Sequence, residues 1–179
     1  MTLGHSPVEA NVTGSIVDFG NGLEADYQAN PDGAKGKIVL VYIGILEGSP
    51  EGSSNLHRSE KTSLALKYGA IGIMIINQVP NGVLLTGTAS VTGALLTIPA
   101  VCIGKEDGMA LKEILKTESA SATIDMTNNS NMINARNVVA TITGSEIPEE
   151  EIVLGGHLDS WDLATGAIDN GIGSFAVVD

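Results

Sequence analysis

The chain has 179 residues, of which 43% are apolar and 17% charged, values that are normal for a globular protein and exclude a disordered one. Its 21 acidic residues against 9 basic ones give a formal charge of −12, which would repel nucleic acid and anionic membranes. No stretch approaches the roughly 18 uninterrupted apolar residues of a membrane-spanning helix, and no secretion signal opens the sequence.

Two β-rich apolar runs come first. Residues 14–19 and 36–43 each predict a strand, and the turn-forming sequence Asn-Pro-Asp-Gly at 30–33 separates them. The second run hardly alternates between apolar and polar residues, so we expect it to be buried on both faces of a sheet.

A helix is predicted next. Residues 46–58 are rich in Gly, Ser, Pro and Asn, which is typical of a loop, and Ser59 then offers an N-cap. The pattern predicts a helix over residues 60–68, with Gly69 as its C-terminal stop.

The remaining elements of the first part alternate in type. We expect a buried strand at 71–76, a long Gly- and Thr-rich excursion over 77–97, and a strand at 99–103. A helix at 106–116 and a strand at 121–126 complete this series.

The polar run at 127–131 is the best candidate for a linker, so we predict two domains, 1–130 and 131–179. Beyond the linker, residues 137–143 and 152–155 predict two further strands. A helix is expected to begin at the extreme C-terminus of the chain.

The lone cysteine, Cys102, cannot form an internal disulfide and is predicted to pack as a small apolar side chain. A single cysteine therefore does not indicate whether the protein resides in an oxidising or a reducing compartment. We expect the parent protein to be exported, to the periplasm or outside the cell, and any signal peptide to be absent from this chain.

Four signals occur in a fixed order between residues 14 and 126. They are Lys35-Gly-Lys-Ile-Val-Leu-Val, a helix ending in Lys67-Tyr-Gly-Ala, Ile71-Gly-Ile-Met-Ile-Ile-Asn, and Ile98-Pro-Ala-Val. This order resembles the protease-associated (PA) domain. The resemblance implies an α/β (α+β) fold for residues 1–130, with a β-sheet core and flanking helices.

The tail carries a more specific pattern. Ile152-Val-Leu-Gly-Gly-His-Leu-Asp-Ser-Trp-Asp is followed by Gly166-Ala-Ile-Asp-Asn-Gly. Both residue type and spacing resemble the start of the catalytic domain of the di-zinc exopeptidases, the family of aminopeptidases and glutamate carboxypeptidases, and lie closest to its carboxypeptidase Q branch. Residues 131–179 would then be an incomplete, N-terminal fragment of that α/β catalytic domain.

The resemblance implies a role for three residues of this tail. His157 would ligate one zinc ion, Asp159 would orient that histidine, and Asp169 would bridge two zinc ions. The general base and the other ligands of the family lie later than Asp179. By this reading the parent protein hydrolyses peptide bonds with a metal-activated water, and this chain alone is inactive.

Chemistry alone points the same way for these residues. A catalytic zinc needs nitrogen and oxygen ligands, and a carboxylate usually holds the second nitrogen of an imidazole ligand. His157 and Asp159 are two residues apart at the end of an expected strand, so both can project to one side. The glycines at 166 and 171 leave the backbone around Asp169 free to take unusual conformations.

Other interpretations stay open. A lone His-x-Asp pair is common in proteins, Asp162 can simply cap a loop, and Trp161 can pack against it or line a substrate cleft. His5 and His57 are expected to face solvent. A different class of function is a non-catalytic PA-domain module for protein interactions, but such a module has no need of His157, Asp159 and Asp169 in register.

The predicted strands of the tail also suggest a partner. Their apolar side chains would be covered by helices in a complete catalytic domain, and uncovered strands are templates for pairing. The segment could dock on the PA domain of its own chain or pair with the same segment of a second chain. We expect the second, a homodimer through the C-terminal segment, besides a peptide substrate of the parent protein.

Overall fold

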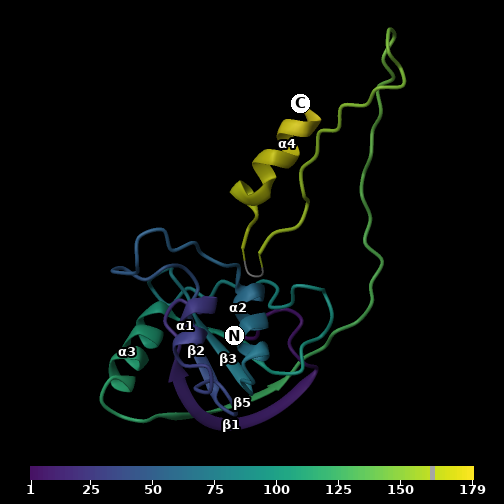
Figure 1. Ribbon diagram of the computed structural model, residues 1–179. Coiled ribbons are helices and arrows are strands. Elements are labelled where there is room, and N and C mark those ends of the chain that lie inside the picture. Colours follow the sequence, from purple (N-terminus) through teal and green to yellow (C-terminus); the bar gives the residue numbers. More distant parts are fainter. Residues whose placement is uncertain (162–163) are drawn as a thin grey trace. The chain divides into compact units, whose positions relative to one another are not determined.

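The computed structural model describes residues 1–161 and 164–179 and divides into two compact units, Met1–Ser130 and Asn131–Asp179 (Figure 1). The first unit contains a five-stranded sheet and three helices. Its strands are β1 (Glu9–Asp18), β2 (Ile38–Tyr42), β3 (Gly72–Ile76), β4 (Ala100–Ile103) and β5 (Ser121–Thr127). Its helices are α1 (Glu24–Ala29), α2 (Arg58–Lys67) and α3 (Lys105–Leu115).

The sheet has the strand order β4-β3-β2-β1-β5, in which the first four strands are parallel and β5 is antiparallel to β1. Strand β1 pairs with two different strands along its length. Its end, residues 16–18, pairs with β2, whereas residues 9–15 pair with β5. Figure 1 accordingly shows β1 as a long curved arrow beside β5.

The core lies on both faces of the sheet, because successive residues of a strand point to opposite faces. Val39 and Val41 of β2 pack in a cluster with Tyr27 of α1, whereas Leu40 packs in a second cluster with Leu111 of α3. Strand β2 is therefore buried on both faces, as predicted, and the predicted α/β (α+β) class is confirmed for this unit.

The edge of the sheet at β4 is covered by the N-terminal residues, for which the sequence predicts no strand. Leu3 donates its backbone N–H to the carbonyl of Ala100 at 2.9 Å, and Cys102 donates to the carbonyl of Met1 at 2.7 Å. Cys102 is buried as predicted, and this burial raises the pKa of its thiol.

Helix α2 begins earlier than the sequence indicates, and the prediction of Ser59 as its N-cap is wrong. His57 is the N-cap: its Nδ1 accepts the N–H of Ser59 at 3.3 Å, and its own N–H is accepted by Glu60 at 2.7 Å. Ser59 lies in the first turn, and its side chain is buried. Gly69 ends the helix region with a φ of +78°, as expected for a C-terminal glycine.

A buried lysine stands where strand β2 ends. The Lys61 ammonium on α2 is fully buried and donates to the carbonyls of Tyr42, Ile43 and Gly44, at 2.6, 3.1 and 2.9 Å. Burial lowers the pKa of Lys61 to about 8. The side chain thus ties the helix to carbonyl groups at and just beyond the end of the strand.

The second unit contains much less regular structure. Its helical part is a kinked turn, η1 (Ala167–Ile172), in which Asp169 and Asn170 have non-helical backbone angles, followed by α4 (Gly173–Val178). The predicted C-terminal helix is confirmed, but the strands predicted at 137–143 and 152–155 are not formed. A strand requires a hydrogen-bonded neighbour, and no part of the chain that the structure describes pairs with these segments.

Candidate metal centre

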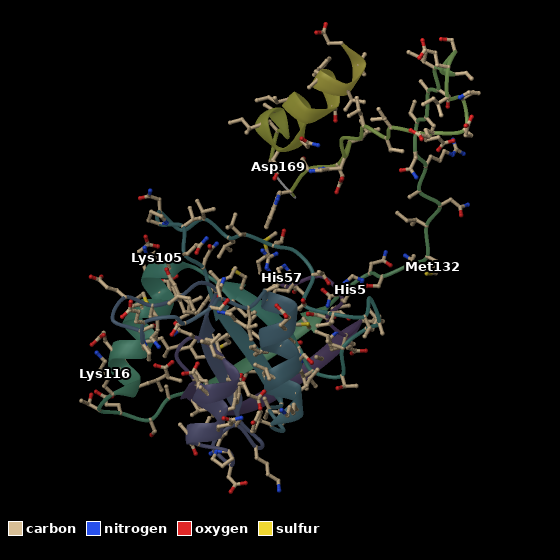
Figure 2. The ribbon with its side chains drawn as sticks, turned by 45° about the horizontal axis from the view of Figure 1, so that its top comes forward. His5, His57, Lys105, Lys116, Met132 and Asp169 are labelled. Carbon is tan, nitrogen blue, oxygen red and sulfur yellow. The ribbon has the colours of Figure 1, made fainter. Side chains whose placement is uncertain are left out.

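The ring of His157 lies between two carboxylates within the second unit. Its Nδ1 is 3.0 Å from the carbonyl oxygen of Asp159 and 3.1 Å from the Oδ1 of the same residue. On the other side of the ring, Nε2 is 2.9 Å from Oδ1 of Asp169. Figure 2 shows Asp169 beside the C-terminal helix. The structure therefore brings the three predicted site residues together.

Asp169 is placed by a tight turn in which glycine is required. Gly166 has a φ of +68°, and a Cβ at this position would lie 2.8 Å from the side chain of Ser160. The turn is closed by a hydrogen bond from the N–H of Gly171 to the carbonyl of Gly166 at 2.7 Å. Gly166 thus allows the chain to turn just before Asp169, and Gly171 closes that turn just after it.

The electrostatic setting favours a positive charge on the ring. The hydrogen bond to the Asp159 carbonyl, together with the negative charges of Asp159 and Asp169, raises the pKa of His157 above its usual value. The side chains of His157, Asp159 and Asp169 are 53, 88 and 64% exposed, so the cluster is open to solvent. The two carboxylates and the imidazole are therefore accessible to an ion from solution.

The donor set fits part of a zinc site. Since a carbonyl oxygen can only accept, the Nδ1 of His157 donates, and this leaves Nε2 as the atom that faces Asp169. The proton between Nε2 and the Asp169 carboxylate is one that a metal ion would displace. A catalytic zinc has about three protein ligands. Among residues 1–161 and 164–179, no group of three or more His, Cys, Asp or Glu side chains could hold a metal ion alone.

Several other predictions concern residues near the site. Asp162 lies outside the residues that the structure describes, and Trp161 beside it is 38% exposed. His5 and His57 of the first unit face solvent as predicted. His5 contacts the hydroxyl of Thr88 at 2.8 Å, and His57 caps helix α2.

One contact was missed by sequence reasoning. The hydroxyl of Ser174 donates to the backbone carbonyl of His157 at 2.9 Å. A serine at the start of a helix is interpreted from sequence as part of the helix, so this contact is seen only in the structure. Among the described residues, no helix is long and apolar enough to span a membrane.

Comparison with protein families gives two matches, one in each unit of the chain. A model of the PA domain matches residues 12–111, and a model of peptidase family M28 matches residues 137–179. Human carboxypeptidase Q is 30% identical over 160 residues, which cover 84% of this chain and 32% of that protein. The chain thus spans about a third of the length of this curated relative.

Solved structures give a consistent result. An aminopeptidase from Aneurinibacillus sp. strain AM-1 matches with a TM-score of 0.55 and 28% identity, over 71% of this chain and 27% of that one. A zinc aminopeptidase from Bacillus subtilis matches with a TM-score of 0.50 and 26% identity, over 72% of this chain and 28% of that one.

Proposed function

Because the chain belongs to the PA domain family and its residues 137–179 match peptidase family M28, we propose that it is the N-terminal part of a zinc-dependent exopeptidase. The proposed substrate is a peptide, from which the parent protein removes terminal residues. The similarity to carboxypeptidase Q and to aminopeptidases alike leaves the end of the peptide that is attacked unassigned.

The observation that carries this proposal is the position of His157 between Asp159 and Asp169. We assign His157 and Asp169 as zinc ligands and Asp159 as the residue that holds the Nδ1 of the ring. Two zinc ions, when bound, would supply an activated water for hydrolysis of the peptide bond. The chain's own contribution is to orient one imidazole and one carboxylate toward each other at 2.9 Å.

The full natural reading frame provides the test. Its product should cleave dipeptides or aminoacyl-nitroanilides, lose this activity with a zinc chelator, and regain it with added zinc. We expect His157→Ala and Asp169→Asn to abolish measurable turnover, because each removes a ligand. We expect Asp159→Asn to cost about 10- to 100-fold, as is usual for a group that orients a metal ligand. Full activity of the Asp169→Asn variant would contradict the assignment.

We propose that residues 1–179 alone bind zinc weakly and hydrolyse nothing. They supply His157 and Asp169 as ligands, and we identify no residue among them for the general base. Elemental analysis after dialysis should find zinc well below one ion per chain, and the same substrates should remain intact. Stoichiometric zinc together with turnover would refute this proposal.

We also propose a homodimer of this chain through its C-terminal segment. The support is a set of apolar side chains in the extended part of the second unit, each between 75 and 98% exposed: Val138, Val139, Ile142, Ile152, Val153 and Leu154. Burying one such side chain is worth about 1.5 to 3 kcal/mol. Light scattering coupled to size exclusion should give twice the monomer mass, and removal of residues 131–179 should give the monomer. A strict monomer for the whole chain at tens of micromolar would be the contrary result.

Export of the parent protein remains a prediction. The natural reading frame upstream of Met1 should contain a basic segment and an apolar run of about 7 to 15 residues, as secretion signals do. An upstream sequence that continues as a folded domain without such a run would contradict it.

A further inference from the structure

Ser174 links the C-terminal helix to the backbone of the candidate metal ligand. It lies in the first turn of α4, is half-buried, and donates its hydroxyl to the carbonyl oxygen of His157 at 2.9 Å. The two residues are 17 positions apart in sequence. Because the hydroxyl is bonded to the main chain of His157, the ring nitrogens stay available for Asp159 and Asp169.

The residue before His157 is in close contact with the same turn of helix. A Cβ added at Gly156 would lie 3.0 Å from the carbonyl carbon of Gly173 and 3.0 Å from the backbone nitrogen of Ser174. Backbone lies against backbone here, so a side chain at position 156 would require the two segments to shift. Gly156 and Ser174 thus fix the distance between the His157 segment and the start of α4.

Asp169 belongs to the same helical end of the chain. It lies in η1, which leads directly into α4, so its carboxylate is carried by the segment that Ser174 attaches to His157. The distance of 2.9 Å between Nε2 of His157 and Oδ1 of Asp169 therefore depends on how these two segments are held together. The hydroxyl of Ser174 is a contact between them that involves neither proposed ligand side chain.

We propose that Ser174 is a positioning residue that holds the segments of His157 and Asp169 close enough for both side chains to reach one metal ion. This inference rests on the proposed metal site. An ion that binds two donors on separate segments must also fix those segments, and a contact already present in the free chain reduces this cost. Loss of one hydrogen bond of this kind should weaken metal binding about three- to tenfold.

Cobalt titration of the whole 179-residue chain tests the inference, because the visible absorption of Co²⁺ reports both its affinity and the geometry of its ligands. Ser174→Ala should raise the dissociation constant about three- to tenfold and alter the absorption bands. Ser174→Thr keeps the hydroxyl and should stay within about twofold of the original chain. Ser145→Ala, at an exposed serine of the same unit, is the matched control and should change nothing.

A second measurement needs no metal. The ¹³C chemical shift of the His157 carbonyl reports the hydrogen bond that it accepts. In the metal-free chain, Ser174→Ala should move this shift toward that of a carbonyl bonded only to water, and Ser174→Thr should restore it. Gly156→Ala should move the shift as well, because the added methyl group forces the two segments apart.

The outcomes separate the inference from the function on which it rests. Binding that is abolished by His157→Ala, weakened by Ser174→Ala and restored by Ser174→Thr supports both. Binding that requires His157 but is equal in the Ser174→Ala chain overturns the role of Ser174 and leaves the metal site standing. Binding that is unchanged by His157→Ala overturns the metal site, and the positioning role falls with it.

Discussion

The two units of the chain use their apolar side chains in opposite ways. Ile73 of strand β3 is fully buried in the first unit, whereas Ile142 of the second unit is 98% exposed. The strands of the first unit bond to one another, while residues 137–143 find no strand partner among the described residues. The packing that stabilises the chain is therefore concentrated in residues 1–130.

The two units also differ in how far their charged side chains are buried. In the first unit, Lys61 and Lys112 are buried, and each is held by oxygen atoms of the protein. In the second unit, His157, Asp159 and Asp169 are all more than half exposed. The two buried lysines of the first unit stabilise its fold, whereas the three charged groups of the second unit are accessible to a ligand.

The largest expected effect compares two isoleucines. Ile73→Ala should lower the free energy of unfolding by about 2 to 5 kcal/mol, because it leaves a cavity in a packed core. In the monomeric chain, Ile142→Ala should change it by less than about 0.5 kcal/mol, because the side chain is exposed there. Urea unfolding followed by circular dichroism measures both. Similar losses for the two variants would show that the second unit has a core of its own.

The next effect concerns the buried ammonium of Lys61. Its pKa is lowered from 10.5 to about 8, so between these values the unfolded chain binds more protons than the folded one. The contribution of Lys61 to stability should therefore rise with pH, by about 2 kcal/mol between about pH 7.5 and about pH 9.5. Urea unfolding at both pH values should show this rise in the original chain, and Lys61→Met should lack it. Parallel pH dependence in the two proteins would mean that Lys61 is not buried.

A smaller effect distinguishes two lysines of helix α3. Nζ of Lys112 lies 2.6 Å from both carboxylate oxygens of Asp18, and its side chain is only 10% exposed. Lys112→Ala should cost about 1 to 2 kcal/mol of unfolding free energy. The control is Lys116→Ala, whose 66% exposed side chain pairs with Glu113, and which should cost less than about 0.5 kcal/mol. Equal melting temperatures of the two variants would contradict the difference.

The sequence predicted the first unit well where a local pattern decides the structure. The strands at β2, β3 and β4 and the helices α2 and α3 follow from apolar runs and a glycine stop. The short helix α1 was missed, because only Tyr27 among its residues is buried and no apolar period marks it. Pairing of the N-terminal residues with β4 was missed for a related reason, since hydrogen bonds between backbones leave little trace in residue type.

Prediction was less complete where a distant part of the chain decides. Residues 137–143 have the composition of a strand, but composition supplies no neighbour to pair with. Burial of Lys61 follows from three carbonyl groups at the end of another element, which its own sequence context does not show. The family resemblance includes both His157 and Asp169 and therefore predicted that they lie close together. Ser174 lies outside the motifs that carry the resemblance, so its contact was not predicted.

The most direct test of this account is a zinc titration by calorimetry of three proteins: the whole chain, the chain ended at Ser130, and the whole chain with His157→Ala. The whole chain should bind zinc weakly, and the other two proteins should bind none beyond what a buffer blank gives. Circular dichroism should show that the shortened chain keeps the fold of the first unit. Zinc binding of equal strength by the shortened chain or by the His157→Ala variant would contradict the assignment of the metal centre to residues 131–179.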